Sequence, residues 1–153
     1  MFKKFLKILL AQKKFFPPKK SKAIILDYIF NDEMKFFFKS INPEYIDVRY
    51  NKINIYVLLC LLFSGEKKIF RNYVKKYIDV VNPKIIITGN DNLSWFYELK
   101  NYFPKIKFIV VQNGFRNQLF FKSINKKKYP KADFIFTFSK SLSKFYKEKI
   151  KSN

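Results

Sequence analysis

Two polar segments of the chain carry side chains that could bind a sugar or a phosphate and take up a proton. Residues 88–92 read TGNDN and follow an apolar run, and residues 112–116 read QNGFR and follow another. Such amide and hydroxyl groups suit sugar hydroxyls, and backbone amides at helix starts suit phosphate. A base that takes the proton of an acceptor hydroxyl could be Asp91 or, as second candidate, Asp27. The candidate binding residues are Thr88, Gly89, Asn90, Asn92, Gln112, Asn113, Gly114, Arg116 and Ser139.

Several of these residues also have a simpler structural explanation. Asp91 and Ser139 stand where a helix is expected to begin, and either could serve only as the helix N-cap. Arg116 could pair with a phosphate or orient a carboxylate, or it could be an ordinary solvated arginine. The residue types alone leave these alternatives open.

Four apolar runs predict the strands that would position the polar segments. The runs are rich in β-branched or aromatic residues and span residues 23–26, 84–88, 106–111 and 134–138. Such continuous runs are typical of strands in a parallel sheet that helices cover on both faces. Residues 45–50 alternate in polarity and predict a fifth, more exposed strand. Because parallel strands end at one edge, we expect a polar cleft there, formed by residues 27–32, 88–92, 112–117 and 139–141.

Helical segments are predicted between these strands. Residues 53–63 predict a buried helix containing Cys60, and residues 66–81 predict a helix capped by Ser64 and ended by Asn82-Pro83. Residues 92–103 predict a third helix, and a last one after Ser139 would face the core with Leu142, Phe145 or Tyr146, and Ile150. The alternation predicts an α/β, three-layer Rossmann-like domain with a mostly parallel sheet of about five strands.

Asn113-Gly114 adds a competing local signal. An Asn-Gly pair between apolar runs is typical of a two-residue hairpin, which would break the parallel pattern. The surrounding alternation of strands and helices favours instead a turn that leaves the sheet, with Gly114 at positive φ.

Residues 1–20 form a separate segment in the sequence. Phe and Leu recur there at helical spacing with Lys between them, and Pro17-Pro18 would stop the helix. The ordinary interpretation is a basic amphipathic helix packed on a domain that spans residues 21–153. The more specific interpretation is an interfacial helix that lies on anionic lipid.

Composition narrows the class of protein further. The 153 residues carry 32 Lys and Arg against 11 Asp and Glu, a formal charge of +21, with 48% hydrophobic residues. These proportions predict a folded domain, and the scarcity of Arg argues against a nucleic-acid partner. With one Cys and no His, no intrachain disulfide can form and His-based chemistry is excluded. We expect a cytoplasmic protein without a bound metal or membrane span.

The ordered set IIITGNDN, WFYELKNYFP, KFIVVQNG and Arg116 resembles the signature region of a bacterial family of surface-carbohydrate biosynthesis proteins. Weaker similarity extends over about residues 22–150 and includes Ile25-Leu26-Asp27, INIYVLLCLLF, Ala132-Asp133 and FIFTFSKSL. The family is regarded as metal-independent glycosyltransferases built from two Rossmann-like domains, the GT-B architecture. The resemblance implies that this chain is similar to the N-terminal, acceptor-side domain.

The resemblance carries expectations about partners and activity. It implies a glycan or lipid-linked acceptor and a cytoplasmic location near the inner membrane, where an anionic membrane surface would be a further partner. It also implies that transfer needs a donor-binding domain, so that this chain either works with a separately encoded one or is a truncated remnant, and that a nucleotide-sugar donor binds only with that domain. The alternative is a non-enzymatic, flavodoxin-like binding module that uses its basic surface on anionic membrane or RNA.

Overall fold

The computed structural model describes residues 10–27, 36, 40–47, 51–64, 69–125 and 131–150. The chain divides into two compact units, Met1–Pro83 and Lys84–Asn153, and each is described by itself.

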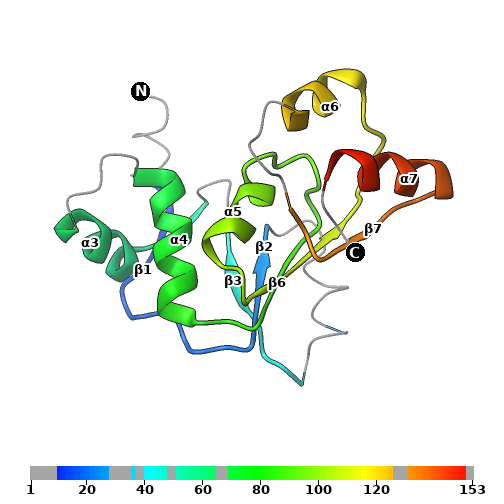
Figure 1. Cartoon of the computed structure of the whole chain (residues 1–153). Coiled ribbons are helices and arrows are strands. Elements are labelled where there is room, and N and C mark those ends of the chain that lie inside the picture. Colours follow the sequence, from blue (N-terminus) through cyan, green and yellow to red (C-terminus); the bar gives the residue numbers. More distant parts are fainter. Residues whose placement is uncertain are drawn as a thin grey trace. The chain divides into compact units, whose positions relative to one another are not determined.

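Parallel strand pairs and two helices form the described part of the first unit (Figure 1). Strand β2 (Ala23–Leu26) pairs in parallel with β3 (Glu44–Ile46), and β1 (Gln12–Lys14) pairs in parallel with β4 (Lys52–Asn54). All four side chains of β2 are buried, as its continuous apolar sequence AIIL predicts.

Helices α3 (Ile55–Phe63) and α4 (Ile69–Val81) lie side by side in this unit. Asn54 begins α3 by accepting a hydrogen bond from the Val57 amide at 3.1 Å. Helix α4 buries one face that includes Val74, Ile78 and Val81, and Asn82 follows it at a φ of 55°.

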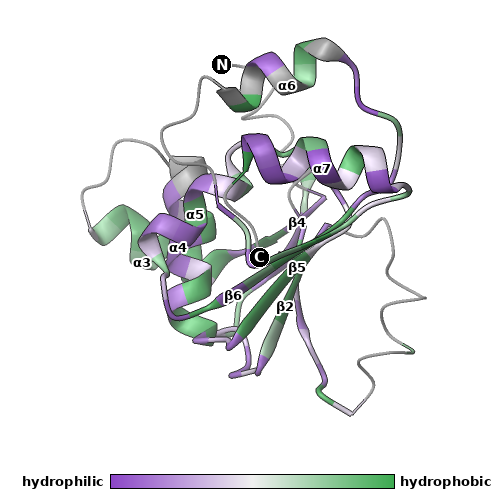
Figure 2. Cartoon of the chain, turned by 45° about the vertical axis from the view of Figure 1, so that its right-hand side comes forward, coloured by the Kyte–Doolittle hydropathy of each residue, from purple (hydrophilic) through white to green (hydrophobic). Residues whose placement is uncertain are grey.

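Several local predictions for the first unit are wrong. Residues 12–14 form strand β1, although a helix was expected up to Pro17-Pro18; residues 1–9 lie outside the described part. Ser64 is the C-cap of α3, where it was expected to cap the next helix. Helix α3 is only half buried, and Cys60 on it is partly exposed. Figure 2 shows α3 as hydrophobic along its whole length, so nothing in its sequence marks the side that faces water.

The second unit has three parallel strands in the order β5–β6–β7. These are β5 (Ile85–Thr88), β6 (Lys107–Val111) and β7 (Phe134–Phe136). Helices α5 (Phe96–Tyr102), α6 (Gln118–Asn125) and α7 (Lys140–Lys149) alternate with them, and α6 lies beside α7 (Figures 1 and 2). Phe96 and Phe108 form an edge-to-face pair 5.2 Å apart in the core.

The Asn113-Gly114 hairpin is excluded, because β6 leads into α6 and then into the parallel strand β7. The alternative, a turn that leaves the sheet, is confirmed. Gly114 nevertheless does not adopt the expected positive φ. Helix α5 begins at Phe96 without a side-chain cap, so Asp91 is not its N-cap.

The predicted Rossmann-like α/β class is confirmed. Five strands form the ladders β2–β3 and β5–β6–β7, all of them parallel, and helices connect them. Within the described residues, no helix combines the length and apolar character needed to cross a bilayer.

Asp133 joins β6 to the segment before β7. Its carboxylate accepts hydrogen bonds from Lys100, Lys107 and the Phe108 amide, at 2.8, 3.1 and 2.8 Å. Burial disfavours the charged form of Asp133, but these donors outweigh burial and lower its pKa. The link therefore depends on an ionised carboxylate.

We predict that Asp133→Asn destabilises the second unit at neutral pH and has little effect in acid. A carboxyl group with a lowered folded-state pKa adds stability above its unfolded pKa of about 4, and that stability is lost as the pH falls through the folded value. Urea unfolding of the wild type and the variant from neutral pH to about pH 2 measures the difference between them. Glu148→Gln is the control, because Glu148 is an exposed carboxylate of the same unit. A gap that stays constant with pH would contradict the prediction.

Candidate functional site

The loops at the carboxyl ends of β5, β6 and β7 meet around one carboxylate, that of Asp91. Asp91 follows β5 and is completely buried, with 0% of its surface exposed. The loop after β6 supplies Asn113 and Arg116, and helix α7 after β7 supplies Tyr146. The sequence prediction that these polar segments gather at one sheet edge is confirmed within the second unit.

Both oxygens of Asp91 accept hydrogen bonds from several donors. The Arg116 guanidinium donates through Nε to Oδ2 at 2.7 Å and through Nη2 to Oδ1. Tyr146 Oη donates to Oδ2 at 2.6 Å, and the Asn113 amide donates to Oδ1 at 3.3 Å. Arg116 Nη2 also donates to the Asn113 side-chain oxygen. We call Asp91, Asn113, Arg116 and Tyr146 the Asp91 network.

The titratable side chains that donate to Asp91 all have raised pKa values. Burial raises the pKa of the Tyr146 phenol well above its ordinary value, and the hydrogen bond to Asp91 raises it further. The hydrogen bond to Asp91 likewise raises the pKa of the Arg116 guanidinium. Tyr97, which donates to the Asp91 backbone oxygen at 2.8 Å, has a pKa raised first by its burial. All three groups therefore stay protonated at neutral pH and act as donors.

Gln112 connects the loops after β6 and β7. Its backbone amide donates to the Phe136 oxygen at 2.9 Å, and its side-chain oxygen accepts from the Phe138 amide at 3.1 Å. Its side-chain nitrogen donates to the Gly114 oxygen at 2.8 Å. Gln112 is buried, and its backbone amide, side-chain oxygen and side-chain nitrogen all have hydrogen-bond partners. It therefore holds the two loops together and does not present its amide to a ligand.

The predicted binding residues fall into two groups. Thr88, Gly89 and Gln112 are buried, and Thr88 Oγ1 accepts from the Asn90 amide at 3.1 Å. Asn92 and Ser139 are exposed, while Asn90, Asn113, Gly114 and Arg116 are partly exposed. Only the second group lies at the surface, where a ligand could touch it.

These contacts resolve two of the alternatives from the sequence, those for Arg116 and Ser139, but not the role of Asp91 as a base. Arg116 orients a carboxylate, so the interpretation as a solvated surface arginine is wrong. Ser139 does cap α7, since its Oγ accepts from the Leu142 amide at 3.3 Å. Asp91 has no exposed surface through which it could reach an acceptor hydroxyl, and its role as a base stays a prediction.

Asp27 belongs to the first unit and is described there alone. It is buried at the end of β2, with a φ of 73° and its amide bonded to the Ile46 oxygen at 2.9 Å. The rest of its predicted loop, residues 28–32, lies outside the described part. Its role as a second candidate base is therefore untested.

An aromatic pair at the same edge was not among the predicted site residues. Phe115 is 88% exposed and Phe138 is 59% exposed, and their ring centres lie 6.2 Å apart. Phe115 lies between the network residues Asn113 and Arg116, and Phe138 precedes the cap Ser139. The sequence signal for this pair was Phe115 within a polar segment. Its pairing with Phe138 depends on β6 and β7 being neighbours in the sheet. Tyr146 was expected on the core face of the last helix, without its link to Asp91.

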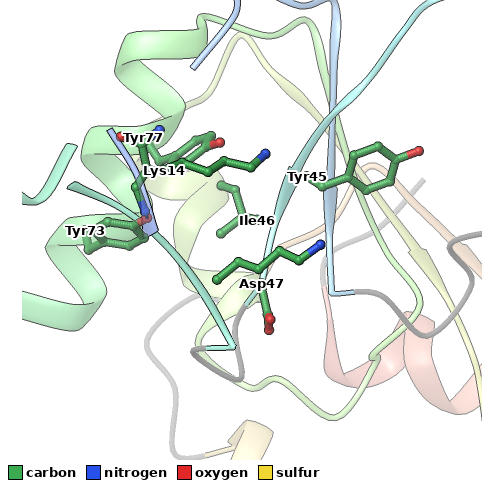
Figure 3. A pocket seen from close by; sticks show the side chains of 8 residues that line it. Lys14, Tyr45, Ile46, Asp47, Tyr73 and Tyr77 are labelled. Carbon is green, nitrogen blue, oxygen red and sulfur yellow. Dashed lines mark hydrogen bonds between the residues drawn. The ribbon is translucent and has the colours of Figure 1, made fainter. Parts of the chain in front are cut away.

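The described part of the first unit includes a small hollow and a larger one. The smaller, about 10 Å³, is the size of one water molecule and lies among Ile46, Asp47, Tyr73 and Tyr77 (Figure 3). Tyr73 Oη accepts from the Asn54 amide at 2.8 Å, and burial raises the pKa of Tyr73 to about 12. The larger hollow, about 370 Å³, is lined by Lys13, Lys14 and Lys19 among others. No group of His, Cys, Asp and Glu in the described ranges could hold a metal ion.

Comparison with known proteins does not assign this chain to a family. No family model matches the chain, and no curated protein or solved structure matches it either. The similarity of residues 82–116 to surface-carbohydrate biosynthesis proteins thus stays a prediction from the sequence.

Proposed function

We propose that the second unit binds a glycan acceptor, as the acceptor-side domain of a GT-B-like glycosyltransferase in surface-polysaccharide synthesis. The observation that carries the proposal is the exposed Phe115–Phe138 pair beside the Asp91 network at the carboxyl edge of parallel strands. That edge is where α/β folds bind their ligands.

The chemistry of the edge suits a sugar. A pyranose ring has an apolar face of C–H groups that packs on an aromatic ring, and hydroxyl groups around its rim that need polar partners. Phe115 and Phe138 offer the aromatic surface. Asn92 and Ser139 are exposed in the flanking segments and offer amide and hydroxyl groups. Aromatic and polar groups together would hold a sugar better than either alone.

The Asp91 network has a positioning role in this proposal. Asn113 and Arg116 flank Phe115 in the chain, and both are bonded to Asp91. Asp91 therefore restrains the backbone on both sides of Phe115, and the Phe138 ring lies 6.2 Å from the Phe115 ring before a ligand arrives. A preorganised ring loses less conformational entropy on binding.

Glycan binding tests the proposal directly. Oligosaccharides of hexoses and N-acetylhexosamines are screened on an array, and any ligand is then titrated by the fluorescence of Trp95, the single tryptophan. We expect Phe115→Ala and Phe138→Ala each to weaken binding by about tenfold, as expected when a buried aromatic contact of about 1.4 kcal/mol is lost.

Phe136→Ala is the matched control, because Phe136 is also exposed and lies on β7 of the same unit. Loss of binding in all three variants, or in none, would contradict a site at Phe115 and Phe138. Incubation with a panel of nucleotide sugars separates binding from transfer: binding without turnover agrees with an acceptor-side role, and robust turnover would assign donor binding to this chain as well.

A further inference from the structure

The first unit exposes two adjacent phenylalanines on a loop that hydrogen bonds hold in place. Phe15 is 66% exposed and Phe16 is 84% exposed, directly before Pro17-Pro18. The Phe16 oxygen accepts from Asn54 Nδ2 at 2.9 Å, and the Lys19 amide donates to Glu44 Oε1 at 2.9 Å. The loop is thus anchored at both ends while its rings stand in solvent, an arrangement that costs solvation free energy unless a partner covers the rings.

Lysines surround this pair of rings. Lys13 and Lys14 precede it on β1, Lys19 and Lys20 follow it, and all four side chains are exposed. The hollow of about 370 Å³ beside the loop is lined by three of these lysines, by Phe15 and Phe16, and by Glu44, whose carboxylate accepts from the Lys19 amide. Its lining would suit a small anionic group that lies close to an apolar surface.

Helix α3 of the same unit provides a second, independent observation. Its sequence IYVLLCLLF contains no charged residue, yet among its side chains only Val57 and Leu61 are buried. Leu59, Leu62 and Phe63 are exposed large apolar side chains. A helix that is apolar on every side is normally covered all round, by protein or by lipid. Helix α3 also contacts β1, the strand that carries Lys13 and Lys14.

We propose that the first unit docks on an anionic phospholipid bilayer, with Phe15, Phe16 and the exposed side of α3 inserted at the interface. Lys13, Lys14, Lys19 and Lys20 would contact lipid phosphates, and the hollow beside them would hold a headgroup. This inference concerns the first unit and does not depend on glycan binding by the second.

Charge and side-chain type favour a bilayer over other partners. A second copy of the chain would bring the same excess of lysine to the interface, and the formal charge of +21 opposes such an association. A nucleic acid would satisfy the lysines and could stack on the phenylalanines, but it offers nothing apolar to Leu59 and Leu62. A bilayer interface offers phosphate and hydrocarbon together.

Vesicle sedimentation of the whole chain tests the proposal. We expect binding to vesicles of phosphatidylcholine with about 30% phosphatidylserine, at least tenfold weaker binding to phosphatidylcholine alone, and weakening as salt rises from about 0.05 to 0.5 M. Equal binding to both kinds of vesicle, or none to either, would overturn the proposal.

Paired variants locate the surface. Phe15→Ser/Phe16→Ser and Leu59→Ser/Leu62→Ser should each lower the partition coefficient at least tenfold. Phe134→Ser/Phe136→Ser, which alters exposed phenylalanines of the second unit, should leave it within about twofold. Circular dichroism confirms that each variant is folded. An equal loss in the second-unit control would overturn the assignment of the surface.

The role of the lysines is tested with two variants that have the same net charge as each other. Changing Lys13, Lys14, Lys19 and Lys20 to Gln removes the same charge as changing Lys105, Lys140, Lys144 and Lys147, which are exposed in the second unit. Only the first set should abolish the preference for anionic vesicles. Equal effects of the two sets, or tighter binding of single-stranded RNA through the first set, would overturn the proposal. So would a dimer in sedimentation that Leu59→Ser/Leu62→Ser dissociates.

Discussion

Asp91→Ala will lower the free energy of unfolding of the second unit by about 3–5 kcal/mol, the usual cost of removing one partner from a buried ion pair. The substitution leaves the Arg116 guanidinium, with 12% of its side chain exposed, without its carboxylate. It also leaves the buried Tyr146 phenol without the carboxylate to which it donates. Urea unfolding followed by Trp95 fluorescence, which reports on this unit, measures the loss.

Two further variants make this result specific to the network. Glu148→Ala removes an exposed carboxylate from α7 of the same unit, and should change stability by less than about 0.5 kcal/mol. The double variant Asp91→Ala/Arg116→Ala should cost less than the sum of the two single variants, because each single change leaves the other partner unpaired. If Asp91→Ala were as stable as Glu148→Ala, the network would not hold the loops together.

The second large effect is expected in the core. Phe108 on β6 is fully buried and packs edge-to-face against Phe96. Phe108→Ala removes this contact and leaves a cavity between the sheet and α5, which should cost about 3–5 kcal/mol. The shift of the urea midpoint, at unchanged slope, gives the value.

The same substitution on the neighbouring strand is the control for Phe108. Phe136→Ala on β7 removes an identical side chain that is 61% exposed, and we expect a change below about 1 kcal/mol. Phe108→Leu, which retains most of the apolar volume, should recover a large part of the loss. Similar costs for Phe108→Ala and Phe136→Ala would contradict the packing of β6.

The strands could be predicted because burial on both faces leaves a simple signal. The runs AIIL and KIIIT are continuous and β-branched, and they match β2 and β5 to within one residue. Strands β1 and β4 were missed, since QKK is wholly polar and KIN contains a single apolar residue. Three-residue strands are held by their partner, and a partner is not visible in local sequence.

Helix boundaries and buried sides were harder to predict for a related reason. Helix α6 was not predicted, because QLFFKSIN follows the Asn113-Gly114 signal and the favoured turn left open what comes after it. Helix α3 was expected to be buried because hydrophobicity alone cannot show that part of an apolar helix meets solvent. In both cases tertiary contacts override the local pattern.

The location of the candidate site could be predicted from the sequence, but its hydrogen bonds could not. Polar residues after apolar runs located the edge, and Asp91, Asn113 and Arg116 do meet there. Spacing could not show that Asp91 is enclosed by donors, because Tyr146 reaches it from 55 residues further along the chain. Nor could it show that Phe115 and Phe138 pair across two loops.

The separation of Asp91 and Tyr146 also bears on how the protein is made. A chain that leaves the ribosome from its N-terminus presents β5, Asp91 and Arg116 well before α7 exists. During that interval the carboxylate can hold its arginine but not its phenol, and the loop that carries Phe115 remains only partly tethered. Closure of the longest contact in the network therefore requires α7, the last helix described.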